Sequence, residues 1–167
     1  MLPNNYSSTA QLPVGSGVYV CRYPTNASLK AVIRFVKEQL GYEIQAPSHL
    51  HCTILYSVHQ PTTVMYPATN TVMGQVVALD RWDGADLLGY LVLKLAGVQL
   101  QFAHNRWAHA GCPPTFSPYN PHVTIKTPCS AGEYDTDQLR KANEVLRNQK
   151  LELHFTHEFL YQNEDVV

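Results

Sequence analysis

The sequence predicts an α+β fold with an antiparallel sheet. Segments with the two-residue period of strands are interleaved with segments of helical period, and some strands follow one another without a helix between them. The chain has 167 residues, enough for one domain with a substantial core. We expect residues 17–167 to form this domain. Residues 1–16, which are polar and rich in Ser, Pro and Asn, are expected to form a flexible arm.

Apolar spacing and turn residues place the individual elements. Leu29, Val32 and Val36 recur at the helical period, and Gly41 follows as a stop signal. Alternating and β-branched residues indicate the strands. The expected helices span about 26–40, 97–110 and 136–149, and the expected strands about 17–21, 49–56, 71–80, 89–95, 122–126 and 151–161.

Composition excludes several function classes. The formal net charge is −1, which argues against binding long nucleic acid but leaves room for a small anionic ligand. No apolar run is long enough to span a membrane, and the first residues lack the cationic start and apolar stretch of a signal peptide. The four cysteines are irregularly spaced, which favours free thiols in the cytoplasm over disulfides or a zinc site.

A His-x-Thr motif with apolar flanks occurs twice in predicted strands, at 51–53 and 122–124. Residues i and i+2 of a strand point to the same face, so each motif presents one imidazole beside one hydroxyl. The middle residue of each motif points the other way, into the core. The four candidate catalytic residues are therefore His51, Thr53, His122 and Thr124.

Two imidazoles and two hydroxyls around one phosphate suit the cleavage of a phosphodiester next to a ribose 2′-hydroxyl. One histidine takes the proton of the attacking hydroxyl and the other protonates the leaving oxygen, which an ordinary imidazole pKa of about 6.5 permits near neutral pH. The Thr hydroxyls stabilise the phosphate oxygens in the transition state. This chemistry needs no metal or other cofactor, and the near-symmetric motifs leave open which histidine is the base.

Other interpretations of the histidines compete with this one. Either motif histidine alone would be an ordinary half-buried strand residue. A third copy, 154–156, is set aside because a histidine and not an apolar residue follows it, and because it lies close behind the second motif. His49 beside His51 suggests zinc, but four ligands are needed and the cysteines do not supply them. His104 and His109 are interpreted as surface polar residues.

The paired motifs and their separation of 71 residues resemble those of the two-histidine (2H) phosphoesterases, which include RNA 2′,3′-cyclic phosphodiesterases and 2′-5′ RNA ligase-like proteins. Within that superfamily, the chain is most similar to the phage anti-CBASS nucleases. The similar stretches are Gly17–Val20, Leu50–Ser57, Gly89–Leu95 and Tyr119–Ile125.

The resemblance implies a bilobal fold of two antiparallel sheets with pseudo-twofold symmetry and outer helices. It implies a metal-independent enzyme that cleaves 3′-5′ linkages of cyclic di- and trinucleotides, such as 3′,3′-cyclic GMP-AMP, and counters CBASS defence in the infected bacterial cytosol. Tyr19, Trp82 and Glu158 match the positions that hold the nucleotide. Each has a plainer interpretation. Tyr19 could be an ordinary strand residue, Trp82 could cover the edge of the core, and Glu158 could be a solvent-exposed charge.

Two further functions stay open at this point. The same fold could act on RNA, as a 2′,3′-cyclic or 2′-5′ phosphodiesterase, although the net charge of −1 disfavours long RNA. Alternatively, the protein could bind a cyclic nucleotide as a sponge without cleaving it. A sponge does not need two acid–base histidines on opposed strands, so the presence of both histidines favours the enzyme.

Overall fold

The fold is given by a computed structural model that describes residues 17–84 and 88–162, so the predicted arm at 1–16 lies outside the described residues. The helices are α1 (Asn26–Leu40), α2 (Val98–His109), α3 (Thr136–Asn148) and the short 3-10 helix η1 (Pro47–His49), and the strands are β1 (Val18–Pro24), β2 (Cys52–Ser57), β3 (Val72–Trp82), β4 (Gly89–Ala96), β5 (His122–Cys129) and β6 (Glu152–Gln162). The α+β class and the order of the elements are confirmed.

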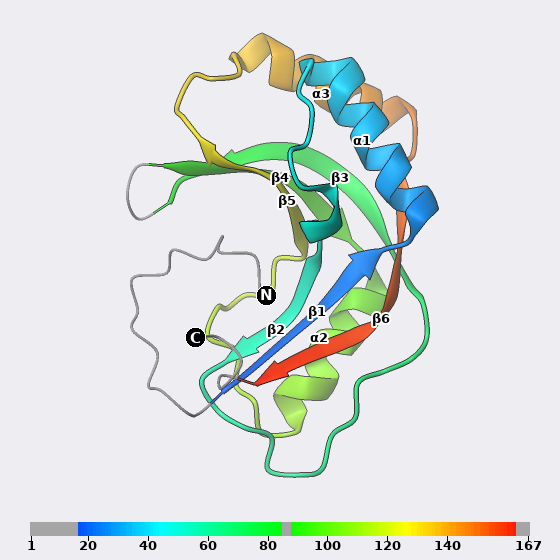
Figure 1. Ribbon diagram of the computed structural model, residues 1–167. Helices are drawn as coiled ribbons and strands as arrows, with labels where there is room; N and C mark the ends of the chain where they lie inside the picture. Colours follow the sequence, from blue (N-terminus) through cyan, green and yellow to red (C-terminus); the bar gives the residue numbers. More distant parts are fainter. Residues whose placement is uncertain (1–16, 85–87, 163–167) are drawn as a thin grey trace.

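All six strands form one closed antiparallel barrel in the order β1-β2-β5-β4-β3-β6 (Figure 1). The expectation of two separate sheets is therefore wrong. The strands β6, β1 and β2 form one half and β5, β4 and β3 the other. The halves join at the pair Cys52↔Val123 on one side and along four pairs between β3 and β6 on the other. These two junctions turn what would be two sheets into one.

The two halves have the same order of elements. In each half a strand, a helix and a second strand follow one another along the chain, as β1-α1-β2 and as β4-α2-β5. The second strand of each half, β2 or β5, lies at the junction between the halves. The strands that carry the two His-x-Thr motifs are thus neighbours, although they are far apart in the sequence.

The core lies on one face of the strands. Cys52 and Val123 are fully buried in the same cluster as Val36 of α1, Trp107 of α2 and Leu146 of α3. Side chains that alternate with core positions point to the opposite face of the sheet. The helices therefore cover the back of the motif strands and leave the other face for the site.

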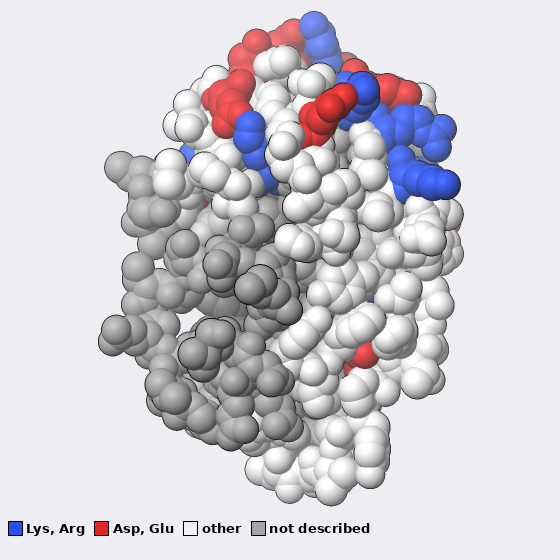
Figure 2. Space-filling view, in the orientation of Figure 1, with Lys and Arg blue, Asp and Glu red and all other residues white. Residues whose placement is uncertain are grey.

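The helices have the predicted amphipathic pattern and well-formed ends. Thr25 caps α1, which ends at Gly41 in the left-handed conformation with φ of 64°. Asp135 and Gln138 form a capping box at the start of α3. No helix in the described part of the chain is long and apolar enough to cross a membrane. Figure 2 shows charged side chains gathered over α1 and α3.

One boundary differs from the sequence prediction. The strand expected at 49–56 begins only at Cys52, because the preceding segment Pro47–His49 forms η1. Proline at the first position of this turn favours a helical start. His51 therefore lies just before β2, in the short link between η1 and the strand.

Candidate active site

The register between β2 and β5 brings the two motifs together. Cys52 pairs with Val123, so in an antiparallel ladder Thr53 lies across from His122, and His51 lies across from Thr124. The middle residues of both motifs are completely buried, whereas the four candidate catalytic residues are half-buried. One face of this junction therefore carries two imidazoles and two hydroxyls.

Both imidazoles are held by the same kind of backbone hydrogen bond. The Nδ1 atom of His51 lies 2.7 Å from the carbonyl oxygen of His49, and Nδ1 of His122 lies 2.8 Å from that of Asn120. Because a carbonyl oxygen only accepts, each Nδ1 carries the proton and donates it. In the neutral ring, Nε2 is then left as the basic nitrogen.

Tyr19 of β1 contacts the first motif directly. Its hydroxyl oxygen lies 2.7 Å from Nε2 of His51 and 3.0 Å from Oγ1 of Thr53. Since Nε2 of the neutral ring is an acceptor, the Tyr19 hydroxyl donates to it and accepts from the Thr53 hydroxyl. The predicted ligand-binding residue Tyr19 thus lies at the centre of the first half of the site.

Trp82 lies at the second motif. It ends β3, and its ring centroid is 4.5 Å from that of His122, at an interplanar angle of 60°. Its indole N–H donates to the carboxylate of Asp80 at 3.2 Å, which fixes the ring. Trp82 is half-buried, so the ring retains exposed surface beside His122. The two aromatic candidates are therefore placed one at each motif.

Burial lowers the pKa of both histidines below the ordinary imidazole value. For His122, burial is the main cause, and the hydrogen bond to the Asn120 carbonyl partly opposes it. For His51, burial is again the main cause, the hydrogen bond to His49 opposes it, and the positive charge of His122 lowers the pKa further. Both rings are consequently neutral near pH 7.

Comparison with known proteins identifies the family. Residues 16–161 match the family described as anti-CBASS protein Acb1. The chain belongs to the anti-CBASS Acb1 family. It is 30% identical, over 129 residues, to the anti-CBASS protein Acb1 of Escherichia phage RB16, which covers 72% of this chain and 69% of that protein. A structure of Kluyveromyces marxianus Usb1 is similar with a TM-score of 0.48 and 10% identity, over 89% of this chain and 95% of that chain.

Glu158 lies on the wrong face of this Acb1-family chain to join the site. It pairs in register with Arg22, whereas Tyr19 pairs with Tyr161 on the same two strands. Odd and even positions of β1 point to opposite faces, so Glu158 and Arg22 share the core face. The assignment of Glu158 as a ligand-binding residue is corrected accordingly.

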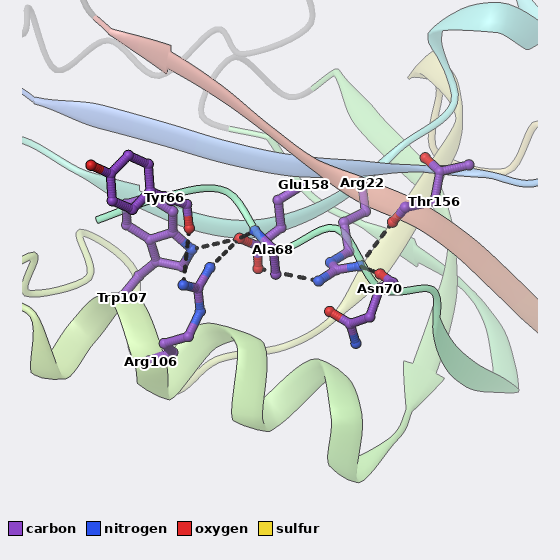
Figure 3. A network of polar contacts seen from close by, with 8 residues as sticks. All are labelled: Arg22, Tyr66, Ala68, Asn70, Arg106, Trp107, Thr156 and Glu158. Atoms are coloured by element: carbon purple, nitrogen blue, oxygen red, sulfur yellow. Dashed lines mark hydrogen bonds and ion pairs between the residues drawn. The ribbon is translucent and has the colours of Figure 1, made fainter. Parts of the chain in front are cut away.

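The buried carboxylate of Glu158 instead joins several elements, as Figure 3 shows. It forms ion pairs with Arg22 of β1, at 3.3 Å, and with Arg106 of α2. It also accepts from the indole of Trp107 at 3.1 Å and from the backbone N–H of Ala68 at 2.8 Å. The side chain of Glu158 is 0% exposed. These contacts make Glu158 a structural residue that fastens α2 and the 66–70 segment to the barrel.

Two further residues of this family member position the first motif, and sequence reasoning missed both. Tyr119 donates its hydroxyl to the carbonyl oxygen of Thr53 at 3.0 Å. The ring of His104 stacks on Tyr119 with centroids 4.1 Å apart, and its Nδ1 lies 2.8 Å from the Ile54 carbonyl oxygen. His104 is 6% exposed, so its interpretation as a surface residue is wrong. Its position four residues after Leu100 on α2 was the available signal.

His49 and Thr156 of the third His-x-Thr copy make local structural contacts in the described residues. His49 belongs to η1 and uses its carbonyl oxygen to hold His51. Within 17–84 and 88–162, no group of three or more His, Cys, Asp or Glu side chains is arranged to bind a metal ion. In the third His-x-Thr copy, the Thr156 hydroxyl donates to the Tyr23 carbonyl oxygen, within the strand pair β1–β6.

Proposed function

We propose that this Acb1-family protein is a metal-independent phosphodiesterase that cleaves 3′-5′ linkages of cyclic di- and trinucleotides, such as 3′,3′-cyclic GMP-AMP, and so counters CBASS. The observation that carries the proposal is the pairing of β2 with β5, which places two His-x-Thr motifs on one face. Membership of a family described as anti-CBASS supports the class of substrate.

The reaction is a transesterification within the substrate. The ribose 2′-hydroxyl attacks the adjacent phosphorus, so an O2′–P bond forms while the P–O5′ bond breaks. One histidine takes the 2′-hydroxyl proton and the other gives a proton to O5′. The product is a linear oligonucleotide with a 2′,3′-cyclic phosphate at one end and a 5′-hydroxyl at the other. Water is not consumed.

His51 is the general base and His122 the general acid in this proposal. The Tyr19 hydroxyl donates to Nε2 of His51 and thereby favours its neutral form. The charge of His122 also lowers the pKa of His51, which favours the neutral form of His51 that a base requires. The substrate 2′-hydroxyl would replace the Tyr19 hydroxyl as the donor to Nε2 of His51.

The remaining site residues bind and orient the substrate. Thr53 and Thr124 donate hydrogen bonds to the phosphate oxygens on which charge develops. Tyr19 and Trp82 hold the nucleotide, and the half-buried Trp82 ring beside His122 is suited to stack on a base. Aromatic stacking tolerates different bases, so these contacts leave the base preference broad.

A pseudo-twofold relation between the halves of the 17–167 domain is part of the proposal. The shared order of elements in the two halves and the central position of β2 and β5 support it. Such an axis would pass close to the pair Cys52↔Val123 and exchange the two motifs. A site of this kind suits a ring with two or three similar nucleotides.

The decisive experiment is product analysis by mass spectrometry after incubation of 3′,3′-cyclic GMP-AMP with the protein in EDTA. We expect a linear product with a 2′,3′-cyclic phosphate, and no product from His51→Ala or His122→Ala. His109→Ala, at the exposed end of α2, is the matched control and should retain full activity. An intact substrate with the wild-type protein, across a panel of cyclic di- and trinucleotides, would refute the proposal.

The same panel separates the alternative functions. Cleavage of RNA ending in a 2′,3′-cyclic phosphate, or of a 2′-5′ linkage, in preference to cyclic dinucleotides would indicate an RNA-processing enzyme. Release of unmodified ligand in stoichiometric amount on heating would indicate a sponge. The formal net charge of −1 disfavours the RNA-processing enzyme, and the two histidines disfavour the sponge.

A further inference from the structure

Lys94 is the cross-strand neighbour of His122. In the β4–β5 ladder, Lys94 pairs with His122 and the next pair is Leu93↔Val123. Leu93 and Val123 are completely buried in the core, so Lys94 and His122 point to the opposite face. Side chains directly opposite one another in an antiparallel pair have Cβ atoms about 4.5–5.5 Å apart. Lys94 is therefore placed beside the second motif.

Nothing in the described residues engages this ammonium group structurally. Within 17–84 and 88–162, no carboxylate lies within ion-pair distance of Lys94. On its other side Lys94 pairs with Ala78 of β3, and the Lys94 side chain is half-buried. Lys94 is thus a half-buried cation without an ion-pair partner among the described residues, on the face of the candidate active site.

The other cations of the chain are placed elsewhere or already paired. Arg22 and Arg106 bind Glu158 on the core face, Arg81 binds Asp83, and Lys126 binds Glu133 and lies over the rings of Tyr42 and Tyr134. The rest lie on α1 or α3 or directly follow α3, namely Lys30, Arg34, Lys37, Arg140, Lys141, Arg147 and Lys150. All twelve Lys and Arg residues of the chain lie within the described ranges.

A cation at this place would favour the proposed reaction. The transition state carries more negative charge on the phosphate oxygens than the substrate does, and charged donors stabilise such oxygens more strongly than neutral ones. The Thr hydroxyls are neutral, and the general base is neutral when it acts. A permanent positive charge beside the general acid would therefore complete the set of donors.

We propose that Lys94 is a catalytic residue whose ammonium group binds a non-bridging oxygen of the scissile phosphate and stabilises the charge that develops there. This inference rests on the proposed function, because it assumes a phosphodiester held between the two motifs. It goes beyond the His-x-Thr motifs, which do not include a permanent cation.

The test compares steady-state kinetics of Lys94→Met, Lys94→Arg and Lys94→Ala on 3′,3′-cyclic GMP-AMP. The Met variant keeps the stem and removes the charge. We expect kcat to fall about 10²- to 10³-fold, with a smaller change in KM. Lys94→Arg should recover part of the loss, and added ethylammonium should partly restore Lys94→Ala. Lys30→Met, on the exposed face of α1, is the matched control and should behave as wild type.

The outcomes separate this inference from the function on which it rests. If the wild-type protein cleaves no cyclic nucleotide, the proposed function fails. If it cleaves and Lys94→Met retains activity within about twofold, the role of Lys94 is overturned while the function stands. If Lys94→Met does not fold, Lys94→Arg and rescue of Lys94→Ala are measured instead. If Lys94→Arg and Lys94→Ala both lose activity and ethylammonium does not restore Lys94→Ala, a catalytic role for the Lys94 charge is contradicted.

Discussion

The two imidazoles of the candidate active site are alike on one side of the ring and different on the other. At Nδ1, both donate to a carbonyl oxygen two residues earlier in the chain. Around the rest of the ring, His51 receives the Tyr19 hydroxyl at Nε2, whereas His122 makes an edge contact with the Trp82 ring. The common part fixes the tautomer of both rings, and the different part makes their surroundings unequal.

This inequality predicts how the two histidines respond to a better leaving group. An acid is unnecessary when the leaving group is 4-nitrophenolate, so on adenosine 3′-(4-nitrophenyl phosphate) we expect His122→Ala to remain within about tenfold of wild type. His51→Ala should lose about 10²- to 10⁴-fold, as expected for a missing base. The release of 4-nitrophenolate is followed by absorbance. The reverse pattern, with His51→Ala spared, would exchange the two roles.

The direction of the pKa shifts predicts the pH dependence. His51 must be neutral to act as base, so the rising limb of kcat/KM follows its lowered pKa. His122 must be protonated to act as acid, so the falling limb follows its lowered pKa. Because both limbs move to lower pH, the maximum should lie below the ordinary imidazole value of about 6.5. A maximum above pH 7 would contradict neutral, desolvated histidines.

At the scale of elements, the buried Glu158 network joins β1, β6, α2 and the 66–70 segment. We expect Glu158→Gln to lower the free energy of unfolding by about 3–5 kcal/mol, because it leaves the buried guanidinium of Arg22 without its counter-ion. Urea denaturation measures this. Glu152→Gln, exposed on the same strand, should change stability by less than about 0.5 kcal/mol.

The Glu158→Gln variant also tests the corrected assignment. A variant that keeps wild-type stability but binds the cyclic nucleotide more weakly would return Glu158 to the ligand site. The structure predicts the opposite combination, since the network lies behind the motif strands. Folded Glu158→Gln protein, at a temperature well below its midpoint, should retain the wild-type KM.

Tyr119, in the loop before β5, donates a hydrogen bond to β2 and so links the two strands that carry the motifs. Tyr119→Phe removes the hydrogen bond to the Thr53 carbonyl oxygen and should destabilise the fold by about 1 kcal/mol. We also expect a lower kcat, because the position of Thr53 is then less well fixed. Tyr66→Phe, on an exposed side chain, is the control. Unchanged kcat and stability would show that this link is dispensable.

The sequence predicts most elements because their signals are local. Apolar spacing defines α1, and Gly41 in the left-handed conformation marks its end. The error at the start of β2 has an equally local cause, since Pro47 favours a turn of helix where alternation alone indicates a strand. The prediction of His104 as a surface residue is wrong because His104 lies on the buried apolar face of α2, to which Leu100 and Trp107 belong.

At the scale of the whole molecule, the closure of the barrel could not be predicted. It depends on pairs such as Cys52↔Val123 that join residues far apart in the sequence and leave no local pattern. The resemblance placed both motifs in one site but gave two sheets, and the structure closes them into one. The separation of Tyr19 from Glu158 has the same origin, because the register of β1 with β6 decides which face each takes.

The distribution of charge over the molecule gives the last prediction, which concerns salt. Six of the twelve Lys and Arg residues lie on α1 and α3, where Figure 2 shows basic and acidic side chains close together. Several of them form ion pairs there, so no basic stripe is available for a polymer. Raising the salt concentration from about 50 to 200 mM should therefore weaken binding of the cyclic dinucleotide by less than about threefold, compared with the 10³- to 10⁵-fold typical of a protein that makes 6–10 phosphate contacts. Titration of the inactive His122→Ala variant measures this directly.

Excess long RNA should not compete with the cyclic dinucleotide. Competition at low salt would indicate a polymer-binding surface that the positions of the twelve Lys and Arg residues do not suggest. The cyclic ligand should thus be selected by the shape and chemistry of the junction between β2 and β5, and not by long-range attraction.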